Sequence, residues 1–96
     1  MTGRQIRRLR EQLRLDPFAL AGVLGVHVST IYRWESSTVD VKMDPLQALL
    51  MERLRERVAT QPKSADDLSQ AIVKGLVTGG ALVALLALLK KLLDDD

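Results

Sequence analysis

The sequence contains no cysteine and only one histidine, and each shortage excludes a class of function. Without cysteine the chain has neither a disulfide framework nor a thiolate metal site, and its composition is compatible with a reducing cytosol. A single histidine cannot form a catalytic or metal-binding cluster by itself. We therefore expect a protein that is not an enzyme and that has no cofactor and no metal site.

The net charge is only +2, but the charges are unevenly distributed along the 96 residues. Residues 1–63 carry eleven Lys or Arg and seven Asp or Glu, whereas residues 64–96 carry three and five. Five arginines lie between Arg4 and Arg14, where Glu11 is the only acidic residue. Such a basic stretch suits an anionic partner such as a phosphate backbone, although a solvated helix face has the same composition.

Apolar residues recur at helical spacing along the front of the chain, and no stretch reads as a strand. Residues 3–14 are predicted to form a first amphipathic helix. Asp16 and Pro17 supply the N-cap and the first helical position of a second helix. Gly25 ends that helix, since glycine accepts the left-handed backbone conformation of helix ends. A third helix is predicted at residues 27–36, after a single intervening residue.

A second cap-and-proline pair, Asp44-Pro45, begins a fourth amphipathic helix that continues to about residue 58. No secretory signal peptide is expected, because the chain starts with charged residues and lacks an apolar run there. The predicted fold is all-α, with a compact four- to five-helix domain followed by a long apolar C-terminal helix or a bent helix pair. Its predicted parts are a domain at 1–60, a linker at 61–64, an apolar helical segment at 65–93 and an acidic terminus at 94–96.

The run IRRLREQLRLDPFALAGVLGVHVSTIYRWE contains Leu20-Ala21, Leu24-Gly25-Val26, Thr30-Ile31 and Arg33-Trp34-Glu35. In this order and spacing the run resembles the Cro/C1 (XRE-type) helix-turn-helix family, and the resemblance covers residues 3 to about 58. Ala21 is small where two helices cross closely, and Gly25 makes the tight turn. The resemblance implies that Trp34 faces the core and that Glu35 bonds back to Arg7 or Arg10 of the first helix.

The resemblance also implies that the third helix lies in the major groove of DNA, where each base pair presents a distinct pattern of donors and acceptors. Arg33 is then the best candidate for a guanine, because a guanidinium can bond O6 and N7 together. His27 has a second interpretation, as a phosphate donor or helix cap. The implied base-reading residues are His27, Val28, Ser29, Tyr32 and Arg33. The implied phosphate contacts are Arg4, Arg8, Arg14, Thr30 and Lys42.

Two positions depart from the family pattern. Pro17 stands where many members place a polar residue followed by Gln, whose amide reaches a phosphate, and proline cannot donate from side chain or backbone. Ser36-Ser37-Thr38 replaces a glycine that commonly follows the helix-ending glutamate. These departures weaken the phosphate clamp on one side. They also leave room for a domain that keeps the fold without binding DNA.

The tail is continuously apolar from Ala81 to Leu89, and a helix that is apolar all round has to be buried all round. An oligomer, a membrane or the front domain of the same chain would bury it. The uncharged run 75–89 is about 22 Å long as a helix, which is short against a hydrocarbon core of ~30 Å. We prefer the oligomer, in which small residues let helices approach closely. The predicted oligomerisation residues are Leu68, Ala71, Ile72, Gly75, Leu76, Gly79, Val83 and Leu86.

Local features leave the shape of the tail open. Gly79-Gly80 costs about 1 kcal/mol per glycine relative to alanine inside a helix, so either close packing compensates or the tail bends there. Ser64 with Asp67 three residues later resembles a capping box and predicts where the tail helix begins.

Two functions are compatible with these features. The preferred one is a sequence-specific, repressor-like DNA-binding transcriptional regulator that is cytoplasmic and nucleoid-associated. It self-associates through its C-terminal helix, so that two recognition helices reach half-sites about 34 Å apart. The alternative is a self-assembling or membrane-attached scaffold that uses the same module to bind protein, or DNA nonspecifically. Arg33 and the basic first helix favour the regulator, whereas Pro17 and the apolar tail favour the scaffold.

Overall fold

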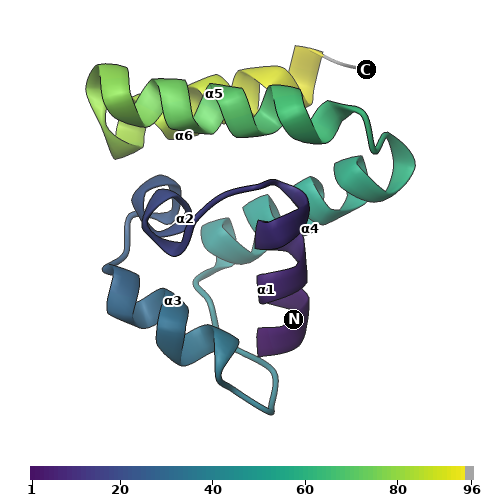
Figure 1. Cartoon of the computed structure of the whole chain (residues 1–96), viewed down its shortest axis with the longest axis vertical. Coiled ribbons are helices and arrows are strands. Elements are labelled where there is room, and N and C mark those ends of the chain that lie inside the picture. Colours follow the sequence, from purple (N-terminus) through teal and green to yellow (C-terminus); the bar gives the residue numbers. More distant parts are fainter. Residues whose placement is uncertain (95–96) are drawn as a thin grey trace.

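The structure, a computed structural model, describes residues 1–94, the last of them by its backbone only. Helices account for about three quarters of this range, and no strand is formed within it, which confirms the all-α prediction (Figure 1). The side chains of the acidic terminus predicted at 94–96 lie outside the described residues. The helices are α1 (Gly3–Gln12), α2 (Pro17–Leu24), α3 (Val28–Glu35), α4 (Pro45–Thr60), α5 (Ser64–Gly79) and α6 (Ala81–Asp94).

The predicted starts of α2 and α4 and the predicted end of α2 are confirmed, whereas α1 ends at Gln12 rather than at residue 14. Asp16 caps α2, where its Oδ1 accepts from the backbone N–H of Ala19 at 2.8 Å, and Pro17 follows at the first helical position. Gly25 ends α2 with φ at 70°, in the left-handed region that a side chain would disfavour. Asp44 caps α4 in the same way as Asp16 caps α2, by accepting from the third residue of the helix.

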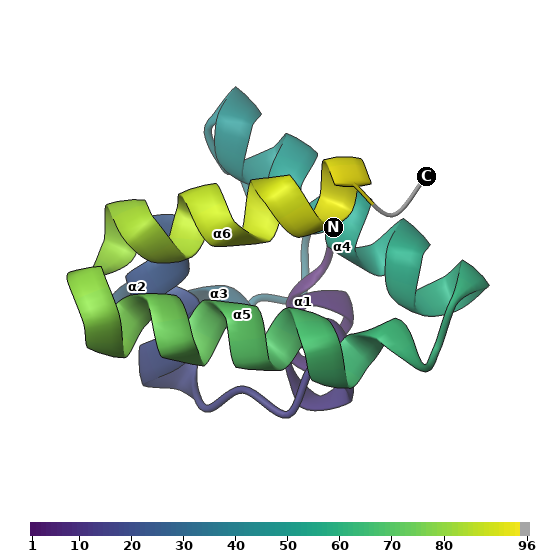
Figure 2. The same cartoon turned by 90° about the horizontal axis from the view of Figure 1, so that it is seen from above.

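The tail folds back onto the front of the same chain as two antiparallel helices, rather than forming one long helix. The break falls at Gly80, where φ is 85° and ψ is −163°. Figure 1 shows the α5–α6 hairpin across one end of the molecule, over α2, and Figure 2 shows α5 and α6 lying side by side. Of the shapes predicted for the tail, the bent helix pair is the correct one.

The predicted capping box at the start of the tail is wrong. Ser64 is the first residue inside α5, and its hydroxyl donates to the carbonyl of Gln61 at 2.7 Å. The N-cap is Lys63, which makes no capping hydrogen bond with its side chain. The turn at 61–63 therefore places the helix start one residue earlier than the pattern indicated.

One continuous cluster of buried apolar side chains joins the front helices to the hairpin, and we call it the shared core. Its members from α5 and α6 are as inaccessible as those from α1 to α4. Side chains that are at most 1% exposed come from each of the six helices: Ile6, Leu20, Ile31, Leu54, Ile72 and Leu88. Among residues 1–94, no helix combines the length and the apolar character that crossing a membrane requires.

Gly75→Ala is expected to lower the free energy of unfolding by about 1–3 kcal/mol, the usual cost of overpacking a tight contact. A Cβ at this position would lie 2.5 Å from the Cα and 2.9 Å from the N of Ala84 in α6. Because these are backbone atoms, the two helices of the hairpin would have to separate. Urea denaturation followed by circular dichroism measures the loss.

Gly22→Ala is the matched control for this substitution. The three atoms nearest to its Cβ would belong to the side chain of Leu76, with Cδ2 at 2.8 Å, and a leucine side chain can rotate away. Alanine also gains up to about 1 kcal/mol of helix propensity. Equal losses in the two variants would show that close approach of α5 and α6 is not why Gly75 is a glycine.

Candidate nucleic-acid interface

Helix α3 has one face open to solvent and one face built into the shared core. Ser29, Tyr32, Arg33 and Ser36 are exposed at spacings of three, four and seven residues, which places them on one side of a helix. Ile31 and Trp34 lie on the opposite side, where they are 0% and 9% exposed. Trp34 is thus a core residue, as expected.

The end of α3 is fixed to α1 by a nearly buried ion pair. Arg10 Nε donates to Glu35 Oε2 at 2.7 Å, and Arg10 Nη2 donates to Oε1 at 3.1 Å. A third donor of the guanidinium, Nη1, bonds the carbonyl of Leu15 at 2.9 Å. The hydrogen bond to Glu35 raises the pKa of Arg10 against the opposing effect of burial. Of the two partners expected for Glu35, Arg10 is therefore the one used.

The start of α3 is capped by the chain's only histidine. His27 is the N-cap residue, and its Nδ1 accepts from the backbone N–H of Ser29 at 3.1 Å. The Ser29 hydroxyl lies 2.9 Å from the same ring nitrogen. Because Nδ1 accepts a hydrogen bond, the proton of the neutral imidazole lies on Nε2. The Nε2–H is thus the donor that the exposed ring has left to offer. Of the roles predicted for His27, the helix cap is confirmed.

The implied base-reading residues do not all share the open face. Ser29, Tyr32 and Arg33 lie there, and Tyr32 is 50% exposed. Val28 is half-buried and packs against the shared core. Ser36 was missed by sequence reasoning, although its position seven residues after Ser29 places it on this face. Within residues 27–36, the open positions carry no acidic side chain, since Glu35 is turned toward Arg10.

The implied phosphate contacts are dispersed over the molecule rather than gathered around α3. Arg14 pairs with Asp66 of α5 at 3.4 Å, next to the hairpin. Arg8 lines a shallow depression with Arg55 and Ala59 of α4. Only Thr30 belongs to α3, where it is half-buried.

The other two phosphate candidates are exposed. Arg4 lies on α1, and Lys42 lies in the loop that joins α3 to α4. That loop is held to the start of the chain, because Val41 donates its backbone N–H to the carbonyl of Met1 at 2.9 Å. Its Asp40 lies 3.5 Å from the amino terminus.

The start of α2 has little to offer a phosphate. Pro17 has no N–H, and the Asp16 carboxylate occupies the backbone N–H of Ala19. The expected weakness of the clamp thus has a structural counterpart at this helix end. Within residues 1–94, no three His, Asp or Glu side chains are grouped so that they could hold a metal ion.

Comparison with known proteins adds one finding. A family model described as a helix-turn-helix domain matches residues 2–51, which span α1 to α3 and the start of α4. A search of curated proteins and a search of solved structures each returned no match.

Proposed function

Because the chain belongs to the helix-turn-helix domain family, we propose that it is a sequence-specific DNA-binding transcriptional regulator. The observation that carries the proposal is the open face of α3. Ser29, Tyr32 and Arg33 stand together on a helix whose other side is anchored by Ile31, Trp34 and the Arg10–Glu35 ion pair. A rigidly held helix with one polar, non-acidic face is the form that enters a major groove.

The finer assignment to the Cro/C1 (XRE-type) family is part of this proposal. It is supported by the quoted motif from Ile6 to Glu35 and by three of its predicted details. Gly25 makes the left-handed turn, Trp34 is buried, and Glu35 bonds to the first helix. A repressor-like role follows from that family and is proposed with it.

We assign Arg33 to a guanine, and Tyr32 and Ser29 to neighbouring base edges or phosphates. We assign to His27 the donation of its Nε2–H to a phosphate. Val28, which is half-buried, contributes at most a thymine methyl contact at the start of the helix. Arg4, Arg8, Arg14, Thr30 and Lys42 remain the proposed phosphate contacts.

Arg33→Ala is expected to reduce the preference for a selected duplex over a random one by about 1–3 kcal/mol, or roughly 5- to 150-fold. The selected duplex comes from rounds of enrichment on the full chain, and binding is followed by fluorescence anisotropy across salt concentrations. Arg33→Lys keeps the charge but not the bidentate geometry, so it should lose discrimination while keeping nonspecific affinity.

Lys74→Ala is the control, because it removes one exposed positive charge from α5, away from α3. It should leave both the preference and the salt dependence unchanged. If Arg33→Ala weakens selected and random duplexes equally, Arg33 contacts phosphate and the base-reading role is wrong.

Self-association is the second part of the proposed function. One copy offers a single short recognition helix and dispersed basic residues, so two copies on adjacent half-sites would provide the affinity that one lacks. Leu68, Ile72 and Gly75, predicted to meet a second chain, are buried within the hairpin of one chain. Exposed apolar side chains on α4 and α6 support a contact there instead.

An adaptor that binds protein through α3 is a second candidate, favoured by the start of α2. At the helix end that would bind a phosphate, Asp16 places a negative carboxylate and Pro17 has no hydrogen-bond donor. The same DNA titration separates the candidates, since an adaptor would bind selected and random duplexes alike, and weakly.

A further inference from the structure

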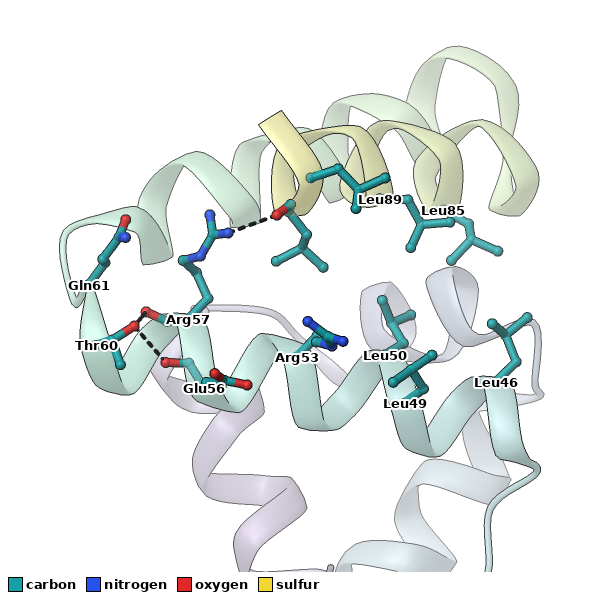
Figure 3. A pocket seen from close by; sticks show the side chains of 12 residues that line it. Leu46, Leu49, Leu50, Arg53, Glu56, Arg57, Thr60, Gln61, Leu85 and Leu89 are labelled. Atoms are coloured by element: carbon teal, nitrogen blue, oxygen red, sulfur yellow. Dashed lines mark hydrogen bonds between the residues drawn. The ribbon is translucent and has the colours of Figure 1, made fainter. Parts of the chain in front are cut away.

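An apolar groove runs between α4 and α6, on a part of the molecule that the DNA proposal does not use. The two helices diverge there and enclose a volume of about 510 Å³. Figure 3 shows leucines of α4 on one wall, facing leucines of α6 on the other. The walls are formed chiefly by Leu46, Leu49 and Leu50 of α4 and by Leu85, Leu89 and Leu92 of α6.

A hydrogen bond joins the two walls at one end of the groove. Arg57 of α4 donates to the backbone carbonyl of Leu92 in α6 at 2.8 Å (Figure 3). The shared core fixes the two helices from below, through Leu54 of α4 and Leu88 of α6. Both walls of the groove are therefore held in place by contacts within the chain.

Along one edge of the groove, and sharing Leu89 and Leu93 with it, α6 carries a ridge of mostly exposed leucines. Leu82, Leu86 and Leu93 are 68%, 57% and 72% exposed, and the half-buried Leu89 completes the row. Their spacings of four, three and four residues are those of a coiled-coil seam. Exposed apolar rows of this kind mark contact sites on soluble proteins.

We propose that a second copy of this chain covers the groove, with the α6 ridge of each copy packed against the α6 ridge and α4 wall of the other. The proposal rests on the self-association included in the proposed function and assigns its surface. The ridge and the groove lie side by side on α6. A two-fold axis can therefore place the ridge of each copy against the groove of the other. Leu46 and Leu49 of α4, 57% and 53% exposed, would be covered by the same contact.

The extent of the exposed leucines favours a second chain over a small molecule. Leu82 and Leu86 belong to the ridge but do not line the groove, so a small apolar ligand would leave them in water. A helix laid along α6 covers the ridge and the groove together. A standard interface of about 800 Å² per partner is roughly an eighth of the chain's 6075 Å² surface.

The charges around the groove are compatible with a self-complementary contact. Arg53 and Glu56 of α4 line it, so both signs are present at its edge. A rim of mixed sign can pair with its own copy, whereas a rim of one sign would repel it. None of the groove residues belongs to α3, so the contact leaves the open face of α3 uncovered.

Sedimentation of the full chain with a matched pair of variants tests the surface. Leu86→Glu places a carboxylate in the ridge of each copy, and it should raise the dissociation constant of the dimer at least about 100-fold. Val77→Glu makes the same type of change on α5, where Val77 is 84% exposed and outside the groove. It should change the dissociation constant less than about threefold. Circular dichroism verifies that both variants fold.

Single cysteines provide a second test, because the sequence has none of its own. In a parallel pair of α6 helices every ridge position faces its own copy across the two-fold axis. In an antiparallel pair centred on the ridge, the two middle positions, Leu86 and Leu89, lie nearest to the axis. Under mild oxidation, Leu86→Cys or Leu89→Cys should give a disulfide-linked dimer, since a disulfide forms only where Cα atoms approach within about 7 Å. Val77→Cys should stay unlinked.

The outcomes separate this proposal from the proposed function. A wild-type chain that dimerises and then loses the dimer through Leu86→Glu supports the surface, even if it binds no DNA. A dimer that survives Leu86→Glu and forms no cross-link through either ridge cysteine overturns the surface but leaves self-association standing. A wild-type chain that stays monomeric overturns it. A monomer that binds the amphiphile 1-anilinonaphthalene-8-sulfonate, and loses it through Leu49→Glu, would assign the groove to a small apolar ligand.

Discussion

A chain ending at residue 61 is expected to lose at least about 3 kcal/mol of unfolding free energy relative to the full chain. The truncation removes Leu68, Ile72 and Leu88, which are 0–1% exposed in the shared core. It also uncovers the sides of α2 and α4 against which they pack. Burying one large apolar side chain contributes about 1.5–3 kcal/mol, so losing several consumes much of a small domain's stability. Urea denaturation of the two chains measures the difference.

The full chain is expected to unfold in one transition for the same reason. Trp34, the only tryptophan, reports on α3 through its fluorescence, whereas far-ultraviolet circular dichroism reports on all helices, including the hairpin. The two probes should give the same urea midpoint. Separate midpoints, or an equally stable truncated chain, would show that the domain at 1–60 is independent of the tail.

Arg10→Met is expected to cost about 3 kcal/mol, because it strands the Glu35 carboxylate in a nearly buried site. The side chains of Arg10 and Glu35 are only 13% and 11% exposed, so water cannot replace the lost partner well. Replacing both, with Arg10→Met and Glu35→Leu together, should recover most of the loss, since two apolar groups leave no unpaired charge. Thermal and urea denaturation of the single and double variants form the test.

Arg7→Met is the matched control on the same helix. Arg7 lies 3.7 Å from Glu11, but both side chains are more than half exposed, so this pair should contribute less than about 1 kcal/mol. Added salt should weaken the Arg7–Glu11 pair and leave the Arg10–Glu35 pair nearly unchanged. Equal losses from Arg7→Met and Arg10→Met would contradict the special role of the buried pair.

The ion pair also has a defined pH dependence on its arginine side. The pKa of Arg10 is raised in the folded chain, so its contribution is complete at every pH below the unfolded value and is lost only as the pH rises through the folded one. For a guanidinium both values lie far above neutrality. Titration of Arg10 should therefore cause no change in stability between pH 6 and 9.

Much of the front domain could be predicted from the sequence because its elements are set by local chemistry. Asp16 and Asp44 each precede a proline, and each caps a helix through bonds within a few residues. Gly25 adopts the left-handed turn for a reason confined to its own backbone. The hydrogen-bond partner of Glu35 was predicted from the family resemblance, which left two arginines of the first helix as candidates.

The tail was harder to predict because an apolar pattern states that a helix is buried without stating by what. Gly75 was expected to let helices from different chains approach, but it lies against Ala84 of its own hairpin. The predicted phosphate contacts were uncertain for the same reason, because a local pattern does not show which distant residue a side chain will meet. Arg14 pairs with Asp66, a residue far along the chain, and no local pattern in the sequence predicts that meeting.

Helix α2 stands between the two surfaces proposed for this protein. It packs against α3 on one side and against both α5 and α6 on the other, and Leu76 of α5 rests directly over Gly22. The hairpin and the recognition helix therefore share α2 as a common supporting helix. If binding at both surfaces depends on the position of α2, the effect of each surface on the other is reciprocal.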